Sequence, residues 1–293
     1  MKRCTVALCW LFAACNSSPA RPHGDGGGGG GGGDGGAGGG GDGFTDECPD
    51  QAKLVYLVDQ DNKFSSFDPG TLAFNDVGTL KCPAQLLATP FSMAVDRTPT
   101  AWVLYSSGEL FMVDTATLAC TKTSFANPQG LVNFGMGFVS NSAGSTDETL
   151  FIAGGASGAA IGAGSSTFAT LDTTSLGVST KGSISGWPEL TGTGDAKLWG
   201  FFPNLTPPKV AQIDKTNGSD LTSLPAASLA GTPEAWAFAF WGGDFWIFLK
   251  RSSDASTQVH HMKADGTLST PLPNTGRTIV GAGVSTCAPI TIN

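Results

Sequence analysis

The stretch FSMAVDRTPTAWVLYSSGELFMVDTATLAC (91–120) decides the fold. It contains three short apolar segments, and Asp, Pro, Ser and Gly turns separate them. The first segment, FSMAVD (91–96), is rich in small residues, and the second, AWVLYSS (101–107), is bulky. The third, FMVDTATLAC (111–120), ends in an Asp-Thr turn. Short β-branched and aromatic runs between such turns are typical of antiparallel strands.

The same order of segments recurs along the chain, as in repeat architectures. The strand with the Asp-Thr-like turn appears five times, as SSFDPGTLAF (65–74), FMVDTATLAC (111–120), ATLDTTSLGV (169–178), AQIDKTNGSD (211–220) and HHMKADGTLS (260–269). A bulky apolar strand precedes each copy, at 54–59, 101–107, 149–155, 197–203 and 245–250. Before most of these lies a strand of small residues, at 91–96, 134–139, 189–195 and 235–241. The chain from 44 to 293 is therefore predicted to repeat a four-strand unit five times.

The two ends of this domain predict how it closes. The first copy lacks a small-residue strand, and the chain ends with an unpaired one, TIVGAGVST (278–286). A C-terminal strand that completes the N-terminal blade indicates an all-β, five-bladed β-propeller of four-stranded antiparallel blades. The narrow axis explains the small residues on the innermost strands, Ser92, Ala94, Gly135, Gly137, Thr191, Gly192, Ala237, Ala239, Gly281 and Gly283. Trp102, Trp199 and Trp246 are expected between blades. The alternatives are a pair of β-sandwiches, or a blade miscounted in the low-complexity stretch Gly154–Ser166.

The N-terminal residues predict an exported, lipid-anchored protein. A basic start, Met1-Lys2-Arg3, precedes an apolar run too short to cross a bilayer of ~30 Å, as in a signal peptide. The run ends in LFAAC (11–15), which resembles a bacterial lipobox, although Phe12 stands where Leu is usual. This predicts a signal peptide over 1–14 and lipidation of Cys15. An ordinary signal peptide cut elsewhere is the alternative. Residues 15–43, mostly glycine, predict a flexible tether.

Cysteine usage agrees with export. Once Cys4, Cys9 and Cys15 are set aside, Cys48, Cys82, Cys120 and Cys287 remain, and an even number suggests two disulfides. Cys48 precedes the first strand and Cys287 follows the last, so we predict that they clasp the closure. Cys82–Cys120 follows by elimination, although the expected strands place these two near opposite ends of neighbouring outer strands.

Charge and composition limit the function. A net charge of −8 with 16 Lys and Arg argues against a nucleic-acid partner. Asp59-Gln60-Asp61-Asn62 lacks the Gly and Glu of an EF-hand loop, so a β-turn is favoured over calcium. The adjacent His260 and His261 point to opposite faces of a strand, and solvent exposure is favoured over a metal site. No metal and no cofactor are predicted.

Carboxylates are the first candidates for catalysis. Asp96, Asp195 and Asp244 each follow an innermost strand, where turn chemistry explains them. Glu189 begins such a strand, beside Trp187 at the opposite channel mouth, and is a weak catalytic candidate. A ligand-binding mouth is expected there, made of Phe91, Phe134, Trp187, Glu189, Trp236 and Arg277. The alternative is that the aromatic residues plug the channel and Arg277 pairs with Glu189.

Five stretches resemble a group of myxobacterial lipoproteins to which no activity is assigned. They are TPFSMAVDR (89–97), AWVLYSSGELF (101–111), ELTGTGDAKLWGFFP (189–203), AWAFAFWGGDFWIF (235–248) and TGRTIVGAGVSTCAP (275–289). The resemblance covers most of 44–293 and implies a propeller-like domain in the cell envelope. Asn16 follows Cys15 in place of the Asp that retains lipoproteins at the inner membrane in enteric bacteria, which favours the outer membrane or the cell surface.

Three functions are therefore considered. The leading hypothesis is a binding module on a flexible tether, for a glycan, a peptide or an envelope protein. The others are a carbohydrate-active hydrolase or lyase, and a structural component of the envelope.

Overall fold

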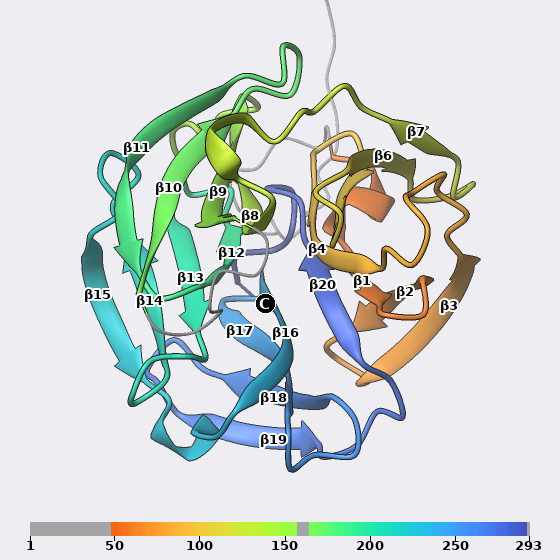
Figure 1. Ribbon diagram of the computed structural model, residues 1–293. Helices are drawn as coiled ribbons and strands as arrows, with labels where there is room; N and C mark the ends of the chain where they lie inside the picture. Colours follow the sequence, from red (N-terminus) through yellow and green to blue (C-terminus); the bar gives the residue numbers. More distant parts are fainter. Residues whose placement is uncertain (1–47, 157–163, 292–293) are drawn as a thin grey trace, which may run out of the picture. The chain divides into compact units, whose positions relative to one another are not determined.

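Each repeat found in the sequence folds as one four-stranded antiparallel sheet, and the five sheets are the blades of a five-bladed β-propeller (Figure 1). The computed structural model describes residues 48–156 and 164–291. The predicted signal peptide (1–14), the lipidation site Cys15 and the tether (15–43) lie outside these residues. Where the chain is described, no helix has the length and apolarity needed to span a membrane.

From the axis outward, blade 1 consists of β20 (Ile279–Gly283), β1 (Val55–Asp59), β2 (Lys63–Asp68) and β3 (Ala73–Thr79). Blade 2 consists of β4 (Pro90–Val95), β5 (Thr100–Tyr105), β6 (Leu110–Asp114) and β7 (Cys120–Lys122). Blade 3 consists of β8 (Asn133–Ser140), β9 (Glu148–Gly155), β10 (Ser165–Leu171) and β11 (Val178–Ser185). Blade 4 consists of β12 (Glu189–Gly192), β13 (Leu198–Phe202), β14 (Lys209–Ile213) and β15 (Asp220–Pro225). Blade 5 consists of β16 (Pro233–Trp241), β17 (Asp244–Arg251), β18 (Gln258–Met262) and β19 (Leu268–Leu272).

Three short 3-10 helices lie in the connections between these strands. They are η1 (Asp50–Lys53), η2 (Pro128–Gly130) and η3 (Ala227–Leu229).

The last strand closes the ring, as predicted. β20 pairs antiparallel with β1, with Gly283 opposite Tyr56, and supplies the innermost strand that the first repeat lacks. The innermost strands β4, β8, β12, β16 and β20 each contact the next around the axis. This topology excludes the pair of β-sandwiches. Blade 3 has four strands, two before and two after residues 157–163, so no blade is miscounted.

Small residues line the axis because the innermost strands lie nearly in backbone contact. A Cβ atom on Gly135 would lie 2.2 Å from the carbonyl oxygen of Pro188. One on Gly192 would lie 2.1 Å from that of Phe138. No side chain fits such gaps, which confirms the reason given for the small-residue strands.

The Asp-Thr-like turns join the two outer strands of each blade. In the first four blades, carboxylate oxygens of Asp68, Asp114, Asp172 and Asp214 accept hydrogen bonds from backbone N–H groups two or three residues later. Four residues after the Asp the chain is left-handed, and blades 1 to 3 place a leucine there, at φ 58–59°. These leucines, Leu72, Leu118 and Leu176, pack against the cores between blades. That packing offsets the steric cost of a left-handed leucine.

The apolar core is divided among the gaps between blades. Each of five buried clusters draws its residues from two neighbouring blades. Both faces of the inner strands are therefore buried, so these strands read as continuous apolar runs, whereas the outer strands β3, β11 and β15 are largely exposed. The predicted inter-blade tryptophans lie in these gaps. Trp102 packs on Phe138 of blade 3, Trp199 on Phe245 of blade 5, and Trp246 on Phe67 of blade 1.

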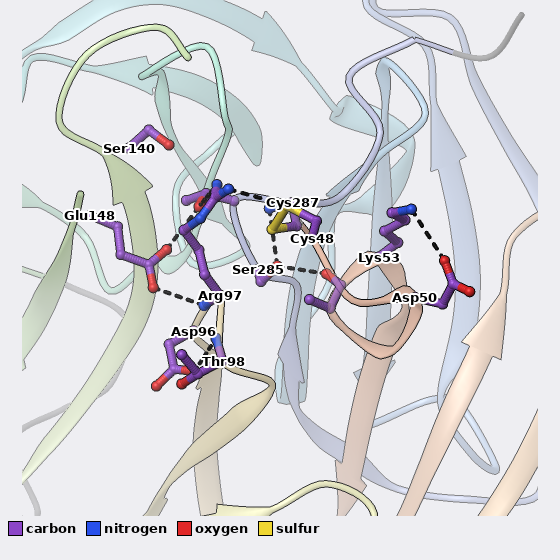
Figure 2. Close-up of a disulfide and its surroundings, with 12 residues drawn as sticks. Cys48, Asp50, Lys53, Asp96, Arg97, Thr98, Ser140, Glu148, Ser285 and Cys287 are labelled. Carbon is purple, nitrogen blue, oxygen red and sulfur yellow. Dashed lines mark hydrogen bonds and ion pairs between the residues drawn. A yellow bond between two sulfur atoms is a disulfide. The ribbon is translucent and has the colours of Figure 1, made fainter. Parts of the chain in front are cut away.

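Both predicted disulfides are present. Cys48–Cys287 joins the segment before β1 to the segment after β20, with a sequence separation of 239 (Figure 2). Cys82–Cys120 joins blades 1 and 2, and here the expected placement was wrong. Cys82 is not part of an outer strand, because β3 ends at Thr79 and the following connection packs into the core between these blades.

Candidate functional site

The beginnings of the five innermost strands surround a cavity of about 320 Å³ at one mouth of the channel. Each of these strands pairs antiparallel with the next strand of its blade, and the chain enters each from the preceding blade. All five therefore run the same way, and their first residues meet at one end. The charged and aromatic residues of its lining are Phe91, Trp187, Glu189, Glu234, Trp236 and Lys250.

Three of these five strands carry a β-bulge at the mouth. The pairing of β4 with β5 skips Phe91, that of β16 with β17 skips Glu234, and that of β20 with β1 skips Val280. All three skipped residues line the cavity. Bulges are frequent beside binding and active sites because they re-aim a side chain out of the strand's alternation.

Glu189 is the buried acid of the cavity. Its side chain belongs to the first residue of β12 and is only 3% exposed. Oε1 accepts hydrogen bonds from the Ser92 hydroxyl of β4 and, at 3.4 Å, from the Met136 backbone N–H of β8. Oε2 has no protein donor within the described residues. Burial raises the pKa of Glu189 well above its usual range, against the opposing effect of these two donors.

Aromatic side chains contribute much of the cavity wall. Trp187 precedes β12, and its ring lies 3.3 Å from the position of a Cβ on Gly155, so it packs over the end of β9. Phe91 and Trp236 line the cavity from blades 2 and 5, and both are half-buried. The mouth therefore combines apolar faces with one buried carboxyl group.

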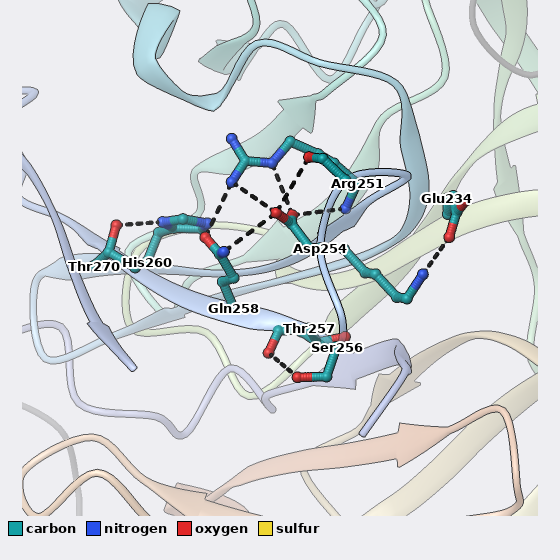
Figure 3. A network of polar contacts seen from close by, with 10 residues as sticks. Glu234, Arg251, Asp254, Ser256, Thr257, Gln258, His260 and Thr270 are labelled. Carbon is teal, nitrogen blue, oxygen red and sulfur yellow. Dashed lines mark hydrogen bonds and ion pairs between the residues drawn. The ribbon is translucent and has the colours of Figure 1, made fainter. Parts of the chain in front are cut away.

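The rim carries one ion pair. Lys250 Nζ of β17 donates to Glu234 Oε2 of β16. Figure 3 labels Glu234 beside the polar network of the same blade. Gln60 and Ser106 add uncharged polar groups to the lining. Glu234 and Lys250 are the charged side chains that line the cavity together with Glu189.

Two of the six residues predicted for the mouth lie elsewhere. Phe134 is fully buried in the core between blades 2 and 3, where it packs edge-on against Phe125. Arg277 points outward, pairs with Asp76 at 2.7 Å and lies over the ring of Phe74. Arg277 is therefore absent from the cavity lining, and the alternative in which it pairs with Glu189 is also wrong. The structure brings the other four, Phe91, Trp187, Glu189 and Trp236, together in the cavity lining.

The hairpin aspartates at the other end have local structural roles, as predicted. Asp96 accepts from the backbone N–H groups of Thr98 and Thr100, at 2.9 and 3.0 Å, and from the Trp102 indole. Asp195 pairs with Lys197 at 2.7 Å, and Asp244 contacts His261 Nε2 at 2.7 Å.

The Asp59–Asn62 segment is a β-turn, as predicted. The Asp59 carboxylate accepts from the backbone N–H groups of Asp61 and Lys63, both at 2.9 Å. Within the described residues, no group of three or more His, Cys, Asp or Glu side chains could hold a metal ion.

The prediction of exposed histidines was wrong for His260. The two rings do point apart, but His260 is 2% exposed, and its Nδ1 contacts Thr270 Oγ1 at 2.8 Å (Figure 3). Burial and, to a smaller extent, the nearby Arg251 lower the pKa of His260 to about 4, against an opposing effect of Asp254. His261 stacks on Trp246, with ring centroids 4.5 Å apart.

Sequence reasoning missed Glu234, Lys250 and Gln60. A signal existed for Glu234 and Gln60, because the first lies two residues before Trp236 and the second follows the strand that ends at this mouth. No local signal identifies Lys250, which reaches the cavity only through its pairing opposite Ala235.

Comparisons with known proteins assign no family. No family model matches the chain, and no curated protein matches it. Among solved structures, a nidogen/laminin complex gives a TM-score of 0.48 at 10% identity, covering 78% of this chain and 97% of the other. A Bacteroides caccae protein of unknown function gives 0.38 at 14% identity, covering 73% and 70%. The extracellular domain of a B. thetaiotaomicron one-component system gives 0.38 at 10% identity, covering 76% and 28%. All three TM-scores are below 0.5, so the fold assignment rests on the strand pairing.

Proposed function

We propose that this protein is a binding module whose ligand places one chemical group in the mouth cavity. The observation that carries the proposal is the buried, raised-pKa Glu189 beneath three aromatic side chains. Pockets that combine apolar walls with a few convergent polar groups are typical of ligand sites. The three bulges that aim side chains into this cavity add to the argument.

We also propose that the module is lipid-anchored in the bacterial cell envelope, through Cys15 and the tether over 15–43. The two disulfides support export, because such bonds persist in oxidising compartments. The test is membrane fractionation of Cys15→Ala. The variant should leave the membrane fraction, and retention there would contradict lipidation.

Thermal unfolding of the purified chain tests the binding function. The panel should contain glycans, peptidoglycan fragments and peptides. A ligand at 100 times its Kd should stabilise the fold by ~2.7 kcal/mol. The shift should disappear in Trp236→Ala and persist in Trp241→Ala, an aromatic change outside the cavity. A panel without any shift would leave a structural role in the envelope as the better account.

A second candidate, a carbohydrate-active hydrolase, is favoured by one observation. Glu189 and Glu234 line the same cavity, one buried with a raised pKa and one half-exposed. Glycoside hydrolysis needs an acid with a raised pKa and a second carboxylate. Release of reducing ends from polysaccharides, abolished separately by Glu189→Gln and Glu234→Gln, would establish it. Binding without turnover would exclude it for the glycan tested.

A further inference from the structure

We propose that the group this cavity binds is a cation, an ammonium or guanidinium group, which lies between the Glu189 carboxylate and the aromatic side chains of Phe91, Trp187 and Trp236. The inference rests on the proposed binding function and names its ligand class.

Glu189 brings a buried carboxyl group to the cavity. Within residues 48–156 and 164–291, Glu189 takes part in no ion pair. The protein supplies donors to Oε1 alone, from Ser92 and Met136, and the residue lines the cavity. A buried carboxylate is costly unless it is paired and hydrogen-bonded. A ligand cation would supply the missing partner at Oε2.

Aromatic side chains line the same cavity as the Glu189 carboxyl group. Trp, Tyr and Phe faces attract cations, most strongly where water is displaced. Apolar contact with Phe91, Trp187 and Trp236 and charge attraction to Glu189 would therefore act on the same ligand group.

The surrounding charges agree with a cationic ligand. The one lining cation, Lys250, is held by Glu234 at the rim. The chain as a whole carries a net charge of −8, which attracts cations over long range.

Binding of a cation changes the protonation of Glu189. Because burial raises the pKa of this carboxyl, the empty cavity favours the neutral acid. When the cation enters, the O–H bond of Glu189 breaks, its proton passes to water or buffer, and the carboxylate pairs with the ligand. Glu234 and Lys250 face the same cavity and compensate each other, so Glu189 is the group expected to release the proton.

Isothermal titration calorimetry of the full chain tests the inference. The probes are n-butylammonium, methylguanidinium and the methylamide of N-acetyl-lysine, with 1-butanol as the neutral counterpart of the first. We expect the cations to bind and butanol to bind at least tenfold more weakly. Because burial raises the Glu189 pKa, cation affinity should rise with pH, by at most about tenfold per pH unit, with up to one proton released per ligand.

Two variants sharpen the result. Glu189→Gln keeps the size and an acceptor for Ser92, and should weaken cation binding at least tenfold and abolish its pH dependence. Lys250→Met should strengthen cation binding, because it removes the rim cation and frees Glu234. The control is Asp147→Asn, an exposed change in the β8–β9 hairpin outside the cavity lining, which should alter nothing. Thermal unfolding verifies that each variant folds.

The outcomes separate this inference from the proposed function. A glycan or other neutral ligand that binds equally to the parent chain and to Lys250→Met, with no proton release, would overturn the cation assignment and leave the binding function in place. Cation affinity that is unchanged in a folded Glu189→Gln would also overturn it. If no probe, glycan or peptide binds, the proposed function fails with it.

Discussion

The Glu148 carboxylate in blade 3 accepts a hydrogen bond from the backbone N–H of Arg97 in blade 2, at 2.9 Å (Figure 2). Its other oxygen accepts from the hydroxyl of Thr286, which follows the closing strand β20, at 2.8 Å. The Arg97 guanidinium in turn donates to Thr286 Oγ1 and contacts Sγ of Cys48, both at 3.1 Å. One carboxyl group thus links two blades to the disulfide that closes the ring.

Glu148 should make folding stability pH-dependent. Burial raises its pKa from 4.5 to about 7. Between these values the folded chain holds a proton that the unfolded chain has released, so stability falls as the pH rises through this window. In the parent chain the free energy of unfolding should fall by on the order of 2 kcal/mol between pH 5 and pH 8. Glu148→Gln cannot ionise, so this decrease should be absent from the variant when both are compared by urea unfolding. The neighbouring Asp147→Asn serves as control, and an equal pH profile in all three proteins would contradict the assignment.

His260 should act in the opposite direction. Its pKa is lowered from 6.5 to about 4, so between these pH values the unfolded chain binds a proton at His260 and the folded chain does not. Stability should therefore fall as the pH drops from 6.5 toward 4. His260→Leu should reduce this loss of stability at low pH by on the order of 2 kcal/mol, because leucine does not titrate. The lost hydrogen bond should cost little, since Thr270 is exposed and can bond to water instead. A variant profile as steep as the parent's below pH 6.5 would show that another group titrates there.

The two disulfides should contribute unequally. Cys48–Cys287 closes a separation of 239 residues and Cys82–Cys120 one of 38. In the chain-entropy model the first is worth ~5–6 kcal/mol and the second ~4 kcal/mol. Double Cys→Ala variants of each pair, compared by guanidinium unfolding, should rank in that order. The reverse ranking would mean that strain or residual unfolded structure outweighs loop length.

Gly192 should tolerate no side chain. The Cβ of Gly192→Ala would meet Phe138 O at 2.1 Å and Val139 Cγ2 at 2.4 Å, so β8 and β12 must move apart. Overpacking of this kind costs about 1–3 kcal/mol or more. The matched change Gly177→Ala meets only the Ser175 hydroxyl, at 3.2 Å in an exposed turn, and should be nearly neutral. Equal melting temperatures for the two variants would contradict the close approach at the axis.

Replacement of a left-handed leucine by glycine should change stability according to what the leucine side chain contacts. Leu87 has φ 69° and is 90% exposed, so its side chain gains little from packing. Leu87→Gly should leave stability unchanged or raise it by up to about 1 kcal/mol, because glycine has no steric penalty there. Leu176→Gly, at φ 59° but packed between blades, should lower stability by about 1–2 kcal/mol. Thermal unfolding compares the two variants, and a higher melting temperature for both would contradict the packing role of Leu176.

The candidate site was only partly predictable. Trp187, Glu189, Trp236 and Phe91 could be placed at one mouth, because all innermost strands begin at the same end. Arg277 could not, since nothing in the sequence tells whether its long side chain turns toward the axis or outward to Asp76. Phe134 and Phe91 hold the same position in the sequence pattern, since each is the second residue of an innermost strand. A bulge turns Phe91 into the cavity, however, whereas the unbroken register of β8 leaves Phe134 in the core.

The sequence by itself determined the repeat, the number of blades, the closure by the last strand and the pairing of the four cysteines. These features depend on spacing along the chain and on residue size at the axis, and both can be read directly from the sequence. Tertiary structure alone decided which side chains share the cavity and how deeply Glu189 is buried. Those outcomes depend on the register between strands, and a single skipped residue such as Phe91, Glu234 or Val280 changes where a side chain points.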